Sequence, residues 1–343
     1  MTNKCVLPFI NQDYQFNSPC CVLQEFKAER DTEQLLEDHR NNRRSKFCRN
    51  CWKAEDIGII SKRQKDNKIY ENYLLQNKRM VKIAVIPVGN VCNLHCVMCN
   101  PGLSTAWIKK YKQMYSGYRK WTWTMPEIKP SDVDNIDELE HIEFIGGETL
   151  KSISLWQYLD GLDRNTKFSL QTNGTVELTS KQIKLLNSFK NFNICFSLDG
   201  YDKIFEYIRQ PSKWNQVQQN VKTYIKQFGL NKLSVYVTVS NLNIFYIDKI
   251  MLNLFKLIPS RIELNLVHMP EDLAYNNLSE NVGKIVEKNN PVFFKKNNIK
   301  WIGSSNSIKL MLDYLKKQDK FSKLKLEEHL PELFALITEK ALT

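Results

Sequence analysis

The sequence predicts an α/β protein built on a parallel β-sheet that is covered by helices. Apolar, strand-like runs recur along the chain, and the segment between each run and the next has room for one or more helices. Polar or glycine-containing motifs follow several of these runs, so we expect the working edge at the carboxyl ends of the strands. The expected strands cover about residues 81–87, 141–145, 167–172, 193–198, 232–240 and 261–267.

The two ends of the chain differ from this central pattern. Residues 1–75 contain short apolar pieces, a charged helix expected at about residues 24–41, and five cysteines. Near the other end, Ile308, Met311 and Leu315 keep helical spacing, together with Leu312, and Leu333, Phe334, Leu336 and Ile337 predict a second apolar helix face. We expect these helices to close the open side of the sheet or to contact a partner.

Composition narrows the class of protein. The chain has 343 residues, 42% of them hydrophobic, which is enough for one large domain and a smaller one. No apolar run approaches the roughly 20 residues of a membrane span, and the start of the chain lacks a signal-peptide pattern, so we expect a cytoplasmic protein that does not use a membrane. Nine cysteines in clustered spacings favour metal ligation in a reducing compartment over disulfides.

The formal net charge is +12, and much of the excess lies in residues 40–68 and 295–325. Such an excess can attract nucleic acid, nucleotides or an acidic peptide. The simpler interpretation is a set of solvated lysine faces, because the sequence contains no known nucleic-acid-binding motif.

Cys92, Cys96 and Cys99 are the most informative feature. They have C-x3-C-x2-C spacing directly after the apolar run of residues 81–88. Three thiolates can ligate three irons of a 4Fe–4S cube and leave the fourth iron open for chemistry, whereas a closed structural metal site needs a fourth ligand. The alternative is a zinc loop that uses His95 as that ligand.

The cysteine triad, together with three motifs further along the chain, makes the sequence resemble the radical S-adenosylmethionine enzymes. Beside the triad, the resemblance rests on three motifs in the family's order, each after a strand-like run: Gly146-Gly147-Glu148, Gln171-Thr172-Asn173-Gly174 and Ser197-Leu198-Asp199-Gly200. It implies a partial (β/α)6 TIM-like barrel and a cluster whose open iron binds S-adenosylmethionine. Cleavage of S-adenosylmethionine then yields a 5′-deoxyadenosyl radical that takes a hydrogen atom from the substrate.

The resemblance also implies roles for individual residues in binding S-adenosylmethionine. Gly146 and Gly147 let the backbone approach a ligand closely, and Glu148 offers a carboxylate to the amino group. Contacts to the ribose and the methionyl carboxylate are expected from Thr172, Asn173, Ser197, Asp199 and Arg209. Met98 stands where the family often has an aromatic residue near the adenine, and Thr149 replaces the usual proline.

A second set of cysteines comprises Cys5, Cys20, Cys21, Cys48 and Cys51. Four of these thiolates could close a complete 4Fe–4S or zinc site. The runs around them resemble the auxiliary-cluster module of the SPASM-like family, the twitch domain, here placed before the barrel. The resemblance implies that Cys5, one of Cys20 and Cys21, Cys48 and Cys51 hold a second 4Fe–4S cluster. The expected domains are then 1–75 for this module, 76–270 for the barrel and 271–343 for a C-terminal helical extension.

We therefore expect a radical S-adenosylmethionine enzyme that acts on a peptide or protein side chain, or on another small molecule, with an electron donor such as flavodoxin or ferredoxin. One alternative substrate is a nucleotide, nucleic-acid base or sugar derivative. It is motivated by the charge and by the aromatic stretch of Trp107, Tyr111, Tyr115, Tyr118, Trp121 and Trp123, for which a core face is the default. An alternative of a different class is a non-catalytic iron–sulfur binding or sensing protein. Cys195 is expected to be a buried core thiol, and His268 a candidate substrate or proton-relay residue.

Overall fold

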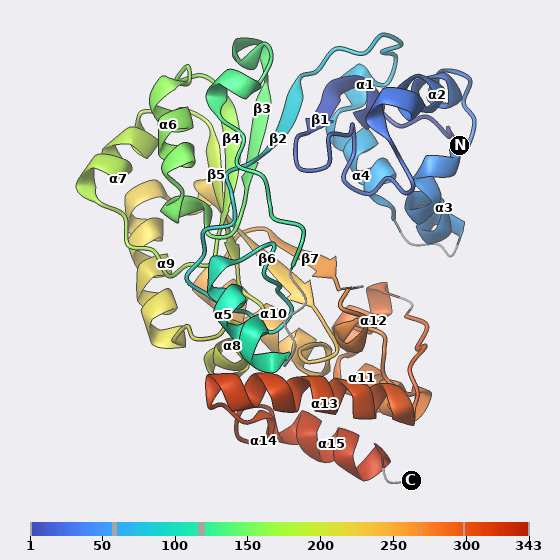
Figure 1. Cartoon of the computed structure of the whole chain (residues 1–343), viewed down its shortest axis with the longest axis vertical. Coiled ribbons are helices and arrows are strands. Elements are labelled where there is room, and N and C mark those ends of the chain that lie inside the picture. The colour runs from blue at the N-terminus through green and yellow to red at the C-terminus, as the bar shows by residue number, and fades with distance from the viewer. Residues whose placement is uncertain (1, 57–59, 116–120, 268, 298, 342–343) are drawn as a thin grey trace.

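The computed structural model has one curled sheet of seven parallel strands, an incomplete TIM-like barrel flanked by helices (Figure 1). It describes residues 2–56, 60–115, 121–267, 269–297 and 299–341, and the strand count refers to these. Each strand pairs with its neighbours in the sequence. The strands are β1 (Asn11–Asp13), β2 (Ile83–Pro87), β3 (His141–Ile145), β4 (Lys167–Thr172), β5 (Phe192–Ser197), β6 (Leu233–Val239) and β7 (Ile262–Leu266).

All six expected strands are present, within a residue or two of the expected bounds, and the expected fold class is confirmed. β1 was not among the expected strands. Its three residues, Asn-Gln-Asp, have no apolar alternation, and only pairing of Asn11 with Ile83 and of Asp13 with Val85 makes this segment a strand. The N-terminal segment therefore contributes an edge strand to the main sheet.

The helices fall into three groups in the chain. Those of the N-terminal segment are α1 (Leu7–Ile10), α2 (Ala28–Arg40), α3 (Arg49–Asp56) and α4 (Lys62–Ile69). Those between strands are α5 (Thr105–Met114), α6 (Ile153–Gly161), α7 (Ser180–Asn187), α8 (Asp202–Ile208), α9 (Trp214–Phe228) and α10 (Ile247–Leu257). The C-terminal ones are α11 (Glu280–Asn289), α12 (Pro291–Lys296), α13 (Ser305–Ser322), α14 (Leu326–His329) and α15 (Pro331–Ala341).

The two faces of the sheet carry different side chains. On β3, Ile142 and Phe144 are fully buried in the main core, which also contains apolar residues of α6 to α10. The alternate residues His141, Glu143 and Ile145 lie on the concave face and are only partly buried. This period of two follows from strand geometry, and it makes the inner face available to a ligand.

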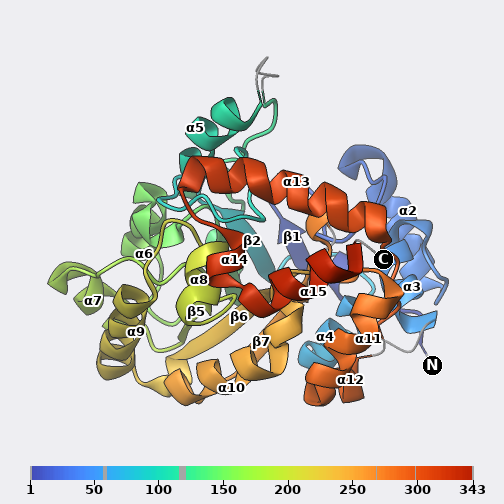
Figure 2. The same cartoon turned by 90° about the horizontal axis from the view of Figure 1, so that it is seen from below.

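The C-terminal helices lie beside the carboxyl ends of the strands, as the view from below shows (Figure 2). Helix α13 begins at a capping box formed by Ser304 and Ser307, and it packs against α5, α15 and the 3-10 turn Glu271–Leu273. The expected apolar faces are confirmed, since Ile308, Met311, Leu315, Leu333 and Ile337 are buried. Within the described residues, no helix has the length and apolar character needed to cross a membrane.

Candidate functional site

The loop that carries Cys92, Cys96 and Cys99 runs from the end of β2 to the start of α5. The beginning of α5 fixes it in three places. The Thr105 hydroxyl accepts a hydrogen bond from the Cys92 amide and donates one to the Cys92 carbonyl, each at 3.2 Å. The Trp107 indole donates to the Cys96 carbonyl at 2.8 Å, and the Ser104 hydroxyl donates to the Leu94 carbonyl at 2.6 Å. The loop is thus positioned by a rigid helix terminus.

The other side of this loop pairs with the residues at the end of α8. The His95 amide donates to the Gln210 carbonyl and the Val97 amide donates to the Ile208 carbonyl, both at 2.8 Å. The fully buried Lys110 ammonium donates to the His95 carbonyl at 3.1 Å and to the Gln210 side chain at 3.0 Å. Through these hydrogen bonds, Lys110 of α5 contacts both the cysteine loop and the segment that follows α8.

The three thiols lie within electrostatic reach of one another. Burial raises the pKa of Cys96 to about 12, and the neighbouring Cys92 thiol adds to this rise while Arg209 opposes it. Burial also raises the pKa of Cys99 above its ordinary value, with further contributions from Cys96 and Cys92. None of the three forms a disulfide. Iron binding would replace the thiol protons, so this soft, partly buried donor set fits a cluster bound through thiolates.

No group of three or more His, Cys, Asp or Glu among the described residues is arranged to hold a single metal ion. His95, the fourth ligand of the zinc alternative, instead packs its ring edge-on against Phe321, with centroids 5.2 Å apart. Its Nδ1 lies 3.5 Å from the Lys110 ammonium. The His95 imidazole is therefore already engaged by α5 and α13.

Gly146 and Gly147 pack against the start of the cysteine loop. A Cβ on Gly146 would lie 2.7 Å from the Gly89 carbonyl oxygen, and one on Gly147 would lie 2.6 Å from the Val91 carbonyl oxygen. The Gly147 amide also donates to the Gly89 carbonyl at 3.0 Å. The lack of a side chain at both positions thus permits a close approach between two loops of the chain itself, and the expected approach of a ligand to these glycines stays a prediction.

Glu148 is almost fully buried, with 1% of its surface exposed. Its carboxylate accepts hydrogen bonds from the Thr172 hydroxyl at 2.8 Å, from the Asn173 amide at 2.6 Å and from the Leu150 amide at 3.3 Å. Burial raises its pKa to about 7, although these hydrogen bonds oppose the rise. Each carboxylate oxygen has two acceptor positions, so an additional donor from a ligand remains compatible with these contacts.

Asn173 connects the β4 motif to the cysteine loop. Its side-chain amide donates to Asn93 Oδ1 at 3.1 Å, and the same nitrogen lies 4.0 Å from Cys92 Sγ. Because its backbone amide also binds Glu148, this single residue touches two of the other predicted motifs. The predicted residues of three motifs therefore meet at one edge of the sheet.

Asp199 and Arg209 form an ion pair with Nε 2.5 Å from the carboxylate. Asp199 is fully buried and also accepts from the Thr238 amide at 2.7 Å. Both side chains were expected to contact S-adenosylmethionine; the structure shows that they contact each other, and their contact with the co-substrate stays a prediction. The terminal nitrogens of Arg209 have no hydrogen-bond partner among the described residues, and the guanidinium affects the pKa of Cys96 and Cys99.

Among the described residues, the side chains of Ser197 and Met98 do not join the hydrogen-bond network described above. Ser197 ends β5 and is partly buried beside Tyr236, and Met98 packs partly buried against the main core. Within the aromatic stretch, Trp107 is a core residue, whereas Tyr111 contacts Tyr115 and Trp121. Tyr118 and His268 lie outside the described residues.

The second set of cysteines gathers in the N-terminal segment. Cys5 and Cys20 are buried against each other and Leu7, whereas Cys48 is buried beside Trp52. Burial raises the pKa of Cys5 above its ordinary value, and the nearby Cys48 and Cys51 thiols add to the rise. Cys20 and Cys21 share a hydrogen bond that raises the pKa of Cys20 and lowers that of Cys21. Four of the five residues are buried, and only Cys21 is exposed.

His39, which was not among the predicted site residues, lies among these cysteines. It is fully buried on α2, with Nε2 3.6 Å from Cys48 Sγ and Nδ1 3.2 Å from both the Cys5 amide and the Asn3 carbonyl oxygen. Burial lowers its pKa to about 4, so the imidazole is neutral at physiological pH. The only signal in the sequence for a buried His39 was its helical spacing from two leucines. It follows Leu36 by three residues and Leu35 by four, on an apolar helix face.

Most of the basic residues in the first charged region are paired with acids. The ion pairs of this region among the described residues are Arg40–Glu33, Arg43–Asp38, Arg44–Asp56, Arg49–Glu25, Lys62–Asp66 and Arg63–Glu55. Such pairs lower the positive potential that this segment presents to a polyanion. The observation gives no support to the nucleic-acid alternative.

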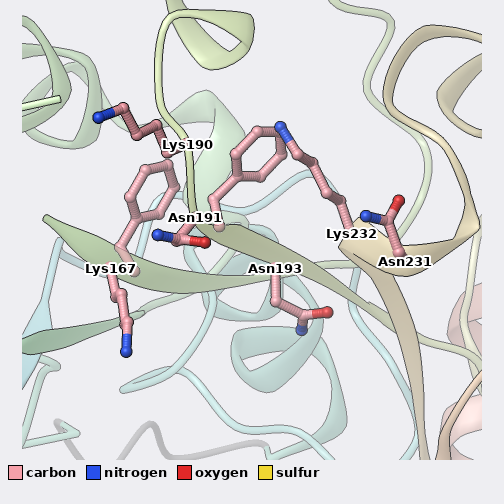
Figure 3. A pocket seen from close by; sticks show the side chains of 8 residues that line it. Lys167, Lys190, Asn191, Asn193, Asn231 and Lys232 are labelled. Carbon is pink, nitrogen blue, oxygen red and sulfur yellow. The ribbon is translucent and has the colours of Figure 1, made fainter. Parts of the chain in front are cut away.

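Two hollows lie away from the edge that carries the motifs. One, of about 260 Å³, lies at the amino ends of β4, β5 and β6 and is lined by lysine and asparagine side chains together with Phe168 and Phe192 (Figure 3). The labelled residues are Lys167, Lys190, Asn191, Asn193, Asn231 and Lys232. The other, of about 330 Å³, lies between α9 and the segment before α7. Neither contains a predicted site residue.

No family model and no curated protein matches the chain. Among solved structures, it is similar to hexahistidine-tagged anSMEcpe with bound AdoMet, at 17% identity and a TM-score of 0.40, over 70% of this chain and 58% of that one. It is also similar to Streptococcus suis SuiB bound to the precursor peptide SuiA, at 12% identity and a TM-score of 0.41, over 90% and 69% of the two chains. A third is TYW1 with a lysine-pyruvate adduct bound, at 13% identity and a TM-score of 0.34, over 70% and 74%. The chain thus spans 58% of the anSMEcpe chain, which is less than two thirds of its length.

Proposed function

We propose that this chain is a radical S-adenosylmethionine enzyme that removes a hydrogen atom from a substrate carbon. One observation carries the proposal. Asn173 binds Glu148 through its backbone amide and reaches Asn93 and Cys92 through its side chain. The triad, the Gly-Gly-Glu loop and the β4 motif, which the sequence resemblance joins only by their order, are thereby adjacent in space.

In this proposal Cys92, Cys96 and Cys99 hold a 4Fe–4S cluster. When bound, the cluster and S-adenosylmethionine supply the 5′-deoxyadenosyl radical. The residues of the chain position this co-substrate. Further contacts are assigned to the backbone of Gly146 and Gly147 and to Met98, Glu148, Thr172, Asn173, Ser197, Asp199 and Arg209. Arg209 is oriented by its ion pair with Asp199, which leaves its terminal nitrogens to bind a carboxylate.

We also propose a second 4Fe–4S cluster in the N-terminal segment, held by Cys5, Cys20, Cys48 and Cys51. Cys20 is preferred over Cys21 because it is buried against Cys5, whereas Cys21 is exposed and its pKa is affected by Lys62. Residues 1–75 would then form an auxiliary-cluster domain, 76–270 the catalytic barrel and 271–343 a helical extension.

The proposed substrate is a peptide or protein side chain, and a flavodoxin or ferredoxin is proposed as the electron donor. The first rests on the sequence resemblance to twitch and SPASM enzymes, many of which modify peptides, and is an analogy at the level of fold. The SuiB structure named above contains a precursor peptide.

The test is anaerobic reconstitution with iron and sulfide, followed by dithionite and S-adenosylmethionine. We expect about eight irons per chain and formation of 5′-deoxyadenosine. Cys96→Ala should lower the iron content to about four per chain and abolish 5′-deoxyadenosine. The matched control is Cys195→Ala, because Cys195 belongs to neither cysteine set, and its iron content should stay at the parent value.

Two other outcomes would change the proposal. Full iron content without 5′-deoxyadenosine at any electron donor would favour the non-catalytic iron–sulfur protein. About four irons together with retained zinc would make the N-terminal cysteines a structural zinc site.

A further inference from the structure

The concave face of the sheet differs from the interior of a closed barrel. Closed (β/α)8 barrels fill their interior with layers of bulky apolar side chains. Here the inward positions are mainly polar, and several remain partly exposed, whereas the opposite face of the sheet is buried in the core. The inward-facing polar residues include Glu143, Ser169, Gln171, Asn193, Cys195, Ser197, Ser234, Tyr236, Thr238 and Glu263. Such a face in an incomplete barrel is suited to holding a ligand.

Two carboxylates lie in one row of this face. Asp13 of β1 pairs with Val85 of β2, and Val85 pairs with Glu143 of β3. Partners in neighbouring parallel strands point to the same side of a sheet, so Asp13 and Glu143 flank Val85 on the concave face. Glu263 of β7 faces the same side, beside its partner Tyr236.

The Asp13 carboxylate is incompletely satisfied. The residue is fully buried, and its Oδ1 accepts from the Gln15 amide at 2.9 Å. Its Oδ2 is buried without a hydrogen-bond partner among the described residues. A buried carboxylate oxygen without a donor costs free energy, so this atom is free to accept a hydrogen bond from a group outside the chain. Burial raises the pKa of Asp13 to about 6, and the nearby Glu143 carboxylate adds to the rise.

The basic side chains near this row form ion pairs with other carboxylates. Lys62 of α4 pairs with Asp66 at 3.0 Å, and Arg261 pairs with Glu263 at 2.8 Å. Glu143 accepts one long hydrogen bond, at 3.4 Å, from the Gln171 amide. Asp13 and Glu143 therefore have no ion-pair partner among the described residues, although the nearby Lys62 charge favours the ionised form of both carboxyls by lowering their pKa values.

We propose that the concave face binds a cationic group of the substrate, an amine or guanidinium, between Asp13 and Glu143. This rests on the proposed function, because it names the class of substrate for the same barrel. Glu143 lies three residues before Gly146, so about 10 Å of strand separates the acidic row from the motif edge. That distance suits a lysine- or arginine-containing peptide, which spans the acidic row and the motif edge together.

The test measures binding without turnover. The reconstituted holoenzyme with S-adenosylmethionine but no reductant is titrated calorimetrically with the peptide Ac-Ala-Ala-Lys-Ala-Ala-amide. Two counterparts carry norleucine or glutamate in place of lysine. We expect the lysine peptide to bind about tenfold more tightly than the norleucine peptide, which corresponds to about 1.4 kcal/mol, and the glutamate peptide to bind most weakly.

Variants locate this preference. Glu143→Gln and Asp13→Asn should each reduce the tenfold preference to about twofold or less. Glu280→Gln, a change of the same kind at an exposed position of α11, should retain it. If either Glu143→Gln or Asp13→Asn fails to fold, the peptide preference of the other variant still tests the proposal.

Three results would overturn the proposal: equal binding of all three peptides, no binding of the lysine peptide, or an unchanged preference for the lysine peptide in both Glu143→Gln and Asp13→Asn. Formation of 5′-deoxyadenosine is measured separately after addition of dithionite. A lysine preference without 5′-deoxyadenosine would contradict only the enzyme proposal, and 5′-deoxyadenosine without the preference would contradict only the cation site.

Discussion

The side-chain amide of Gln318 donates a hydrogen bond of 2.9 Å to the carbonyl oxygen of Val97, which lies 221 residues earlier in the chain. Val97 lies between Cys96 and Cys99, and the Tyr314 hydroxyl donates to the same oxygen at 3.1 Å. Both donors belong to α13, so the C-terminal extension directly supports the loop that carries the triad. The extension thus belongs to the site and not only to the outer covering of the barrel.

Gln318→Leu should loosen the triad loop. The change removes a buried donor to Val97, and we expect the free energy of unfolding to fall by about 1–3 kcal/mol. We also expect the reconstituted protein to lose iron faster in air, measured by absorbance and iron content over time. Gln216→Leu, at an exposed position of α9, should have neither effect. Equal iron loss in the two variants would show that α13 does not support the loop.

The helix-covered parallel sheet was predictable from local patterns in the sequence, whereas its form as a partial barrel was implied by the family resemblance. Apolar runs predicted six strands, and the position of the triad and of Gly146-Gly147-Glu148 after strand ends predicted that these motifs lie at the carboxyl ends of the sheet. β1 was not predictable, because its Asn-Gln-Asp sequence becomes a strand only through pairing with β2. The hydrogen bonds of Gln318 and His39 were not predictable from the sequence either, because both depend on packing between segments that are separated in the chain.

Pairwise contacts inside the site also lay beyond sequence reasoning. Asp199 and Arg209 were each expected to contact the co-substrate, but nothing in their spacing showed that they would bind each other. Gly146 and Gly147 were expected to let a ligand approach the backbone, and nothing in the sequence showed that the backbone of residues 89–91 would pack against them.

His39→Phe should change the N-terminal cluster without affecting the triad cluster. When the imidazole proton is on Nε2, Nδ1 accepts from the Cys5 amide and Nε2 donates to Cys48 Sγ. With the proton on Nδ1, the ring donates to the Asn3 carbonyl and accepts from a Cys48 thiol. An iron-bound thiolate has no proton to donate, so the first arrangement matches the loaded site.

The variant removes this hydrogen bond to sulfur, and we expect a more negative reduction potential for the N-terminal cluster. Electron paramagnetic resonance during a redox titration measures both clusters in one sample, so the triad cluster serves as an internal control. His39→Gln, which retains a donor, should recover part of the shift. An unchanged potential in His39→Phe would show that His39 does not donate to Cys48.

Asp13→Asn should change the pH dependence of stability. The pKa of Asp13 is raised by burial from 3.8 to about 6, so between these values the folded chain binds more protons than the unfolded chain. The parent therefore loses stability from this group as the pH rises through that window, and the asparagine variant does not. Between about pH 4 and about pH 8, the unfolding free energy of the variant should gain about 1–3 kcal/mol relative to the parent. Urea unfolding at both pH values measures this gain, and a difference that is independent of pH would contradict the assigned burial of the charge.

Gly147 provides the sharpest test of how the motif loops are assembled. A Cβ at this position would lie within 2.7 Å of three backbone atoms, of Val91 and Asn90, immediately before Cys92. Backbone atoms cannot rotate away as a side chain can, so relief requires separation of the two loops. Gly161, in contrast, ends α6 with no heavy atom within 4 Å of an added Cβ.

Gly147→Ala should therefore separate the Gly-Gly-Glu loop from the cysteine loop, whereas Gly161→Ala should not. Forcing a methyl group into such a contact costs about 1–3 kcal/mol, and we expect the triad to bind less iron while the N-terminal cysteines retain theirs. Gly161→Ala should be neutral or slightly stabilising, because alanine is favoured over glycine in helices by up to about 1 kcal/mol. Iron content and urea unfolding of the two variants, side by side, separate a specific effect on the site from a general effect of an added methyl group. Parent-like iron content in Gly147→Ala would mean that the two loops can separate without loss of the triad, and that their contact is not what positions Cys92.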